Sequence, residues 1–225
     1  MGLTINGGQP GPGDYRPSRT LGQMGAGTVL SELTSRQFLG DLETSLAIYA
    51  DAMQADPALL PGRRELMRRH AGYPAFRALQ ARAGASGQVV GFAYGFHGRG
   101  GQWWYDAVWN ALVRAVGIGR TNDWLANCLE VAEVHVHQPY QRAGIGTSML
   151  TTLTGGRSER TAVLSTPDRD TTARRLYRRL GFAELLTGYS FPGGSPPYVV
   201  MGAELPLIDP NVRPPRPVSA SPSIS

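Results

Sequence analysis

The stretch from Cys128 to Thr154 constrains the fold of this chain most, because three elements follow one another there in a fixed order. CLEVAEVHVH is a valine-rich run that predicts a buried strand. The glycine loop QRAGIG follows, and TSMLTTL then has the pattern of a helix. A strand, a glycine loop and a helix in this order leave backbone amides free at the start of the helix. The stretch therefore predicts a site for a phosphate group.

A second Gly-Ile-Gly lies upstream at Gly117–Gly119, and its setting is different. It follows DAVWNALVRAV, where Val108, Leu112 and Ala115 recur at helical spacing. We interpret Gly117 as the end of a helix and Gly119 as part of the turn after it. The upstream copy is thus predicted to be structural.

A dinucleotide-binding loop is excluded by two departures from its pattern. That loop has the form G-x-G-x-x-G/A, but Met149 stands at the last of these positions. An acidic residue should also end the next strand, and the predicted strand TAVLST ends without one.

Two motifs resemble those of the GCN5-related N-acetyltransferases. The segment Gln141–Gly146 fits the family's pyrophosphate loop, Q/R-x-x-G-x-G/A. Downstream, DTTARRLYRRLGF fits N-x-x-A-x-x-L-Y-x-x-x-G-F, with Asp170 in place of the asparagine. The resemblance covers about residues 29–205. It implies the α/β (α+β) fold of that family, with a central mixed, mostly antiparallel sheet that is splayed between its fourth and fifth strands and flanked by helices.

The same resemblance implies an enzyme that uses acetyl-CoA as co-substrate. An acetyl group would move to a primary amine by direct attack in a ternary complex. The acceptor would be a small molecule or a peptide, and the protein a monomer or homodimer. The alternative from another class is a catalytically weak module that binds or senses acyl-CoA.

The cofactor contacts are also implied by the resemblance. Backbone groups of the strand would pair with the pantetheine arm, and the loop would hold the pyrophosphate; these residues are Val134, His135, Val136, Gln141, Arg142, Ala143, Gly144, Ile145, Gly146 and Thr147. The resemblance also implies Asp170 as a cofactor contact, because the family's asparagine at this place can donate a hydrogen bond to a pantetheine carbonyl. An ionised Asp170 cannot donate that hydrogen bond. We therefore interpret Asp170, with Asp168, chiefly as a cap of the following helix.

Tyr177 is the candidate general acid, because a phenol can protonate a departing thiolate. The base is Glu130 or Glu133. Relatives often carry a glutamate eleven residues before the loop, which is Glu130 here. The two glutamates face opposite sides of a regular strand, but a β-bulge would change that. We interpret His135 and His137 as packing or surface residues.

An aromatic insertion at about residues 98–127 holds all four tryptophans of the chain. One interpretation is a small satellite core. The other is a wall of the acceptor pocket, with Trp104 and Trp109 as aromatic surface and Asp106 as an ammonium partner.

Other predicted elements are the strand TVLSEL, a helix from Arg36 to Met53 capped by Ser35, a helix from Pro57 to about His70, a hairpin of residues 76–82 and 88–96, and two last strands, FAELLTGYS and YVVMGAEL. Residues 1–28 and 206–225 are rich in glycine, proline and serine, so we expect two disordered tails.

Composition excludes several classes of protein. The chain has no apolar run of 18 residues and no signal-like start, so a cytoplasmic protein without membrane contact is expected. A single cysteine, Cys128, excludes an internal disulfide and indicates no metal site. All 22 basic residues are arginine, which suggests a GC-rich bacterial genome. The net charge is +5, and we interpret doublets such as Arg63-Arg64 as solvated helix faces, so no nucleic acid is expected.

Overall fold

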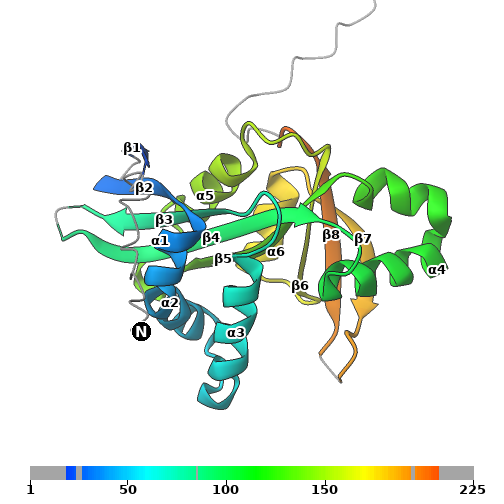
Figure 1. Cartoon of the computed structure of the whole chain (residues 1–225), viewed down its shortest axis with the longest axis horizontal. Coiled ribbons are helices and arrows are strands. Elements are labelled where there is room, and N and C mark those ends of the chain that lie inside the picture. The colour runs from blue at the N-terminus through cyan, green and yellow to red at the C-terminus, as the bar shows by residue number, and fades with distance from the viewer. Residues whose placement is uncertain (1–18, 24–26, 85, 194–195, 208–225) are drawn as a thin grey trace, which may run out of the picture.

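The protein is represented by a computed structural model, which describes residues 19–23, 27–84, 86–193 and 196–207. In this part of the chain one sheet has the strand order β1-β2-β3-β4-β5-β6-β8-β7, and helices pack against it (Figure 1). The strands are β1 (Arg19–Gln23), β2 (Thr28–Leu33), β3 (Arg77–Ala83), β4 (Gln88–Gly98), β5 (Cys128–Val136), β6 (Thr161–Pro167), β7 (Ala183–Tyr189) and β8 (Tyr198–Glu204). The helices are α1 (Ser35–Gly40), α2 (Leu42–Met53), α3 (Leu60–His70), α4 (Trp103–Leu125), α5 (Ile145–Thr154) and α6 (Thr172–Arg179), with short 3-10 turns η2 (Pro57–Leu59) and η3 (Gln138–Tyr140).

The sheet is mixed and mostly antiparallel, as predicted. Every neighbouring pair is antiparallel except β5 and β6. That parallel ladder spans only three Cα pairs, from Cys128 with Thr161 to Glu130 with Val163. Beyond Glu130 the two strands part, which is the expected splay. The sequence did not indicate β1, so the first predicted strand is β2. The fourth and fifth predicted strands are therefore β5 and β6.

Alternate residues of the strands face two different sets of helices. On one face, Ala93 of β4 belongs to the core that α5 and α6 complete. On the opposite face, Phe92 and Tyr94 pack with α1, α2 and α3. The long helix α4 lies near β6, β7 and β8 at the other end of the sheet, where Val108 packs against Val163 (Figure 1). The splay between β5 and β6 thus lies between two groups of helices.

The chain ends differ in part from expectation. We expected residues 1–28 to be disordered, but Arg19–Gln23 form β1 and pair with β2. That prediction was wrong for this segment, because the sequence gives no alternating apolar pattern there. Residues 1–18, 24–26 and 208–225, which include most of both predicted tails, lie outside the described residues.

The first predicted helix is divided in two, and its cap is one residue earlier than expected. Thr34, not Ser35, caps α1: its side chain accepts a hydrogen bond from the Gln37 amide, and the Gln37 side chain accepts one from the Thr34 amide. The chain leaves helical geometry at Asp41, which ends α1 and precedes α2. The helix after Pro57 and the hairpin of β3 and β4 are confirmed.

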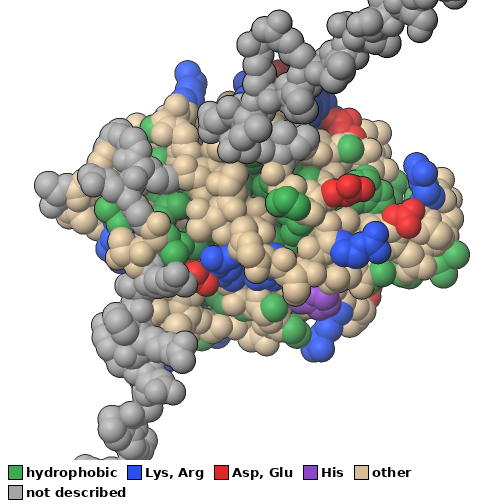
Figure 2. Space-filling view, turned by 90° about the horizontal axis from the view of Figure 1, so that it is seen from above, with side chains coloured by type: hydrophobic (Ala, Val, Ile, Leu, Met, Phe, Trp, Pro, Cys, Tyr) green, Lys and Arg blue, Asp and Glu red, His purple; other side chains and the backbone are tan. Residues whose placement is uncertain are grey.

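Charges of both signs lie close together on the surface. Figure 2 shows arginine and acidic side chains interspersed over the end of the molecule that carries α4. Within the part of the chain that the structure describes, no helix is both long and apolar enough to cross a membrane.

The close approach of β4 to β5 generates a prediction about Gly95. A Cβ at Gly95 would lie 2.6 Å from the Glu130 carbonyl oxygen, which is a backbone atom that cannot swing away. We expect Gly95→Ala to lower the free energy of unfolding by about 1–3 kcal/mol, as overpacking does. Urea denaturation measures this change.

Gly62 provides the matched control. It lies exposed within α3, and a Cβ there meets no atom within 4 Å. Gly62→Ala should therefore raise stability by about 0.5–1 kcal/mol, because alanine favours a helix over glycine. Equal effects of the two substitutions would contradict the tight packing inferred at Gly95.

Candidate active site

The downstream glycine loop has the backbone of an anion-binding nest. Arg142 has φ 64° and Gly144 has φ 81°, so two residues of the loop are left-handed. Gly144 is the N-cap of α5, and the segment from Gln141 to Gly144 is exposed. Left-handed residues at a helix start turn successive amides toward one point. The loop can therefore surround a phosphate with N–H donors.

Two side chains fix this loop in place. The Gln141 amide group donates to the Val136 carbonyl at 3.0 Å and thereby ties the loop to the end of β5. Asp51 of α2 accepts hydrogen bonds from His137 at 2.6 Å and from the Gln138 amide at 2.9 Å. Gln141 was predicted as a cofactor contact, and in this arrangement its side chain positions the loop.

The upstream Gly-Ile-Gly lies inside α4. Gly117 has φ 82° and ψ 164°, which kinks the helix, and the chain then continues helically to Leu125. Gly119 is helical, so the predicted turn after Gly117 is wrong. The Thr121 hydroxyl donates to the Gly117 carbonyl at 2.9 Å and supports the second half. This copy lacks the strand that a phosphate loop follows.

The free edge of β5 faces the splay. Val134, His135 and Val136 pair with β4, whereas the ladder to β6 has already ended at Glu130. Alternate backbone groups of this edge are thus left for an extended ligand. Val134 and Val136 pack toward α5, while His135 lies on the opposite face.

A β-bulge interrupts β5 between its two glutamates. Tyr94 pairs with Glu133 and the next residue of β4, Gly95, pairs with Val131. Ala132 is therefore the extra residue of the bulge.

The bulge brings both candidate bases to one face. Glu130 pairs with Phe96, and Glu133 pairs with Tyr94, two residues earlier on β4. Residues two apart on a regular strand share a face. Glu130 and Glu133 consequently lie on the side of α2 and α3, although they are three residues apart in sequence.

Their environments differ sharply. Glu130 is 4% exposed, and its Oε2 has no hydrogen-bond partner among the described residues. Burial raises the pKa of Glu130 to about 8, so this carboxyl is mostly protonated at neutral pH.

Glu133 is equally buried but has charged partners. Its Oε1 accepts a hydrogen bond from Arg63 at 2.8 Å, and its Oε2 contacts His135 Nε2. Burial alone would raise the pKa of Glu133, but His135 and Arg63 together hold it below its usual range. Glu133 is therefore ionised at neutral pH.

Arg63 and Tyr49 were missed by the sequence analysis. The Arg63 guanidinium lies 4.6 Å from the centre of the Tyr49 ring. Arg63 was interpreted as solvated because it is half of an arginine doublet. Its spacing to Met67 and His70, the buried residues of α3, could have indicated that it faces the sheet.

His70 completes this polar group. Its Nδ1 lies 3.0 Å from the Tyr94 hydroxyl, and burial lowers the pKa of His70 to about 4. His70 is thus neutral at physiological pH.

Tyr177 lies on α6, on the other side of the splay. It is 8% exposed and packs near Phe182. Burial, with a smaller contribution from the Glu133 charge, raises the pKa of Tyr177 to about 12. The phenol therefore keeps its proton at neutral pH.

Asp170 does not cap α6 as predicted, and neither does Asp168. The N-cap is Thr171, whose side chain accepts from the Arg174 amide at 3.0 Å. Asp170 pairs with Arg175 at the surface. Asp168 instead pairs with Arg174 at 2.7 Å and anchors α6 from the side.

The tryptophan-rich insertion forms α4 and contributes to a core with β6 and β8. Trp109 stacks on Tyr105 with a centroid distance of 5.8 Å. Asp106 accepts hydrogen bonds from the Gly101 amide at the start of the helix. Trp104 donates to the Ser165 hydroxyl at 3.0 Å, so it lies over the part of β6 that has parted from β5.

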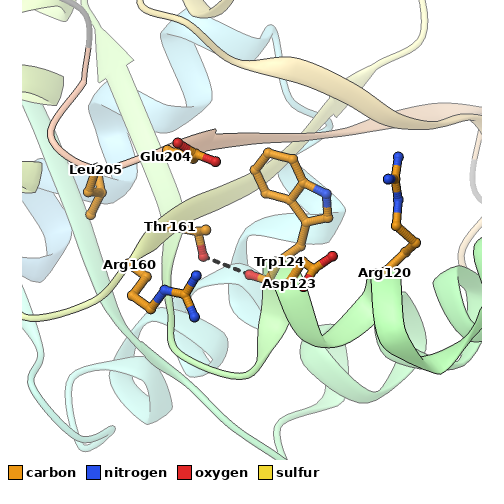
Figure 3. Close-up of a pocket in the computed structure, with 7 residues that line it drawn as sticks. All are labelled: Arg120, Asp123, Trp124, Arg160, Thr161, Glu204 and Leu205. Atoms are coloured by element: carbon orange, nitrogen blue, oxygen red, sulfur yellow. Dashed lines mark hydrogen bonds between the residues drawn. The ribbon is translucent and has the colours of Figure 1, made fainter.

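A pocket of about 550 Å³ lies at the opposite end of β6 from the splay (Figure 3). Arg120, Trp124 and Arg160 border it. The indole of Trp124 packs on β8, where a Cβ at Gly202 would lie 2.8 Å from the ring. Because Thr161 marks the closed end of the parallel ladder, this pocket is separate from the glycine loop.

Comparison with known proteins agrees with this geometry. Residues 80–184 match the model of the acetyltransferase (GNAT) domain. The GCN5-like protein acetyltransferase Rv2170 of Mycobacterium tuberculosis is 32% identical over 178 residues, which are 76% of this chain and 75% of the relative.

Two solved structures share the fold. The ribosomal-protein-S18-alanine N-acetyltransferase of Escherichia coli is 17% identical with a TM-score of 0.54, over 83% of this chain and 99% of that one. The PaiA N-acetyltransferase of Thermoplasma acidophilum, in complex with coenzyme A, is 12% identical with a TM-score of 0.51, over 79% and 98%. With its splayed sheet, its glycine loop and a curated relative matched over most of both lengths, the chain belongs to the GCN5-related family of N-acetyltransferases.

Proposed function

We propose that the protein transfers the acetyl group of acetyl-CoA to a primary amine by direct attack within a ternary complex. The observation that carries this proposal is the splay between β5 and β6. The glycine loop lies at the end of β5, and Tyr177 lies across the splay from Glu133, the residue that contributes to its raised pKa. A ligand laid along the free edge would thus have its anionic end at the loop and its reacting end near Tyr177.

The loop residues fit a pyrophosphate. The amides of Arg142 to Thr147 would hold it, because the left-handed backbone at Arg142 and Gly144 turns them to one side. Val134, His135 and Val136 would pair with the pantetheine arm through their backbone. The fold relative from Thermoplasma was solved with coenzyme A, which supports this ligand. Acetyl-CoA would supply the activated thioester.

Tyr177 would protonate the departing thiolate. Its phenol keeps its proton at neutral pH, so the proton is available for the departing sulfur. Asp170 is paired with Arg175 at the surface, so we no longer expect it to contact the pantetheine.

The amine would approach from the side of α2 and α3, where both glutamates lie. One of them was expected to be the base; Glu130 is mostly protonated near pH 7, and Glu133 is ionised but already bound by two partners. Trp104 would form a wall of this approach, because it covers the parted segment of β6. Trp109 stacks within α4 and Asp106 binds the Gly101 amide just before it, so both are explained without a substrate.

The acceptor class follows only from relatives. The Mycobacterium relative is named a protein acetyltransferase, and the Escherichia structure is named for the alanine of a ribosomal protein. We therefore propose a peptide or small-molecule amine. Release of coenzyme A, measured with a thiol reagent against a panel of amines and peptides, tests the function; no release with any of them would contradict it.

Cofactor binding should depend on the downstream glycines alone. Gly144→Val should weaken acetyl-CoA binding at least tenfold, because a side chain at φ 81° strains the loop and would occupy open space that the pyrophosphate would enter. Gly119→Val should leave the affinity unchanged, since Gly119 lies in α4 with no atom within 4 Å of its Cβ position. Isothermal titration calorimetry gives both values, and equal losses would refute the choice of loop.

Removing one oxygen should separate acid catalysis from binding. We expect Tyr177→Phe to lower kcat by about 10²–10⁴-fold with little change in acetyl-CoA affinity, because only the proton donor is lost. Steady-state kinetics and calorimetry on the same preparation check this. Unchanged kcat would assign Tyr177 to packing against Phe182.

Burial of Glu130 predicts a pH dependence of stability. Its pKa is about 8 in the folded protein and near the reference value of 4.5 when unfolded, so the folded state binds more protons between these values. The contribution of this protonation to the free energy of unfolding is complete below pH 4.5 and is lost as the pH rises through 8.

Glu130→Gln removes this ionisation. We expect the variant to gain stability relative to the parent as the pH rises from 5 to 8, by roughly 1–4 kcal/mol. Urea denaturation at several pH values measures the difference. A constant difference between parent and variant would mean that Glu130 is ionised in the folded protein.

A further inference from the structure

One ring nitrogen of His135, Nε2, contacts the carboxylate of Glu133. The other nitrogen, Nδ1, has no hydrogen-bond partner among the described residues. This His–Glu contact lies on the face by which the amine would approach. We propose that His135 Nδ1 takes the proton of the acceptor amine and that Glu133 is the residue that positions the ring. This proposal rests on the proposed acetyl transfer and names its proton acceptor.

The imidazole is held in a defined orientation by neighbouring rings. Tyr49 of α2 meets it edge-on, with centroids 5.2 Å apart and an interplanar angle of 83°. Phe92 of β4 lies on another side at 5.4 Å and 38°. The His135 side chain is 11% exposed, so it has a limited opening to solvent. A ring fixed by two aromatic neighbours and one carboxylate is preorganised to accept a proton in one direction.

Glu133 is suited to position a base and poorly suited to be one. Both of its oxygens are engaged, one by Arg63 at 2.8 Å and one by His135. Those two partners hold its pKa below the usual range, so its affinity for a further proton is low. A carboxylate that accepts a hydrogen bond from an imidazole fixes the tautomer and stabilises the imidazolium that forms.

Other groups on this face are already committed. Glu130 is mostly protonated at neutral pH and enclosed by the core. His70 of α3 is neutral and bonded to Tyr94 of β4, whose own pKa is raised well above its usual value by burial. In the described part of the chain, Arg63 from α3 and Tyr49 from α2 are the remaining titratable groups packed against Glu133 and His135. Among these groups, the imidazole of His135 is thus the one left with an unengaged acceptor nitrogen, Nδ1.

The proton balance closes with Tyr177. His135 removes one proton from the ammonium group and later passes it to solvent. The free amine nitrogen forms a bond to the carbonyl carbon while the bond from that carbon to sulfur breaks. Tyr177 gives its proton to the sulfur, and the remaining surplus proton on the amide nitrogen returns to the phenolate through solvent.

Chemical rescue tests this assignment. His135→Ala should lower kcat/KM for the amine by about 10²–10⁴-fold while acetyl-CoA affinity stays unchanged. Imidazole added to the variant should restore turnover in proportion to its concentration, and methylated imidazoles should restore it according to their basicity. His135→Gln is the second variant, for use if His135→Ala folds poorly. Glutamine fills the space without a basic nitrogen, so this variant should also be slow.

His97 provides a matched control. Its Nδ1 lies 3.4 Å from Glu159, so it is also a histidine beside a buried carboxylate, but it lies outside the proposed site. His97→Ala should keep its turnover and show no response to imidazole. Glu133→Gln should lower the rate less than His135→Ala, and the double variant should be no slower than His135→Ala, because a positioning residue has no effect once its base is gone.

The outcomes separate this proposal from the one on which it rests. If the parent protein releases no coenzyme A with any amine, the proposed function fails. If the parent turns over and His135→Ala is equally fast, or is slow without rescue by imidazole, the assignment of the base is wrong. A larger loss at pH 7 in Glu130→Gln than in His135→Ala would also overturn it.

Discussion

The parallel ladder between β5 and β6 ends after three pairs, and each part of the candidate site depends on that ending. Inside a sheet, unpaired backbone groups are costly unless something else satisfies them. β5 leaves such groups exposed along Val134–Val136 at the middle of the sheet, where a ligand can replace the missing strand. The same parting opens the sheet between its two faces. Tyr177 and Glu133 lie on opposite faces, yet the charge of Glu133 still contributes to the raised pKa of Tyr177.

The bulge at Ala132 then decides which side chains meet. Without the extra residue, Glu130 and Glu133 would face opposite sides of the sheet. With it, two carboxylates share one face and have opposite protonation states, because only Glu133 has Arg63 and His135 as partners. Differences in desolvation and pairing are the usual means by which a protein assigns different roles to identical side chains.

Local pattern predicted the elements better than it predicted the site. The order of strands and helices from Thr28 onward follows from apolar periodicity and from turn residues, and the two family motifs fixed the class of fold. Strand β1 was not predicted because RTLGQ has no alternating pattern. Thr34 was not predicted as the cap because Ser35, the next residue, is an equally suitable cap by residue type. The face of a side chain near the bulge could not be predicted, since one extra residue reverses it. Arg63 reaches Glu133 across 70 positions of sequence, and no local pattern records such a pairing.

Helix α2 contacts both halves of the site at once. Asp51 accepts hydrogen bonds from His137 and the Gln138 amide just before the glycine loop, and Tyr49, two residues earlier, packs against His135. A ligand that displaces α2 at Tyr49 must also strain the loop at Gln138. The two ligands are then thermodynamically linked, and linkage is reciprocal: the factor by which one changes the affinity of the other is the same in both directions. The turn of α2 that carries Tyr49 and Asp51 would thus determine whether the two substrates bind independently or in a preferred order.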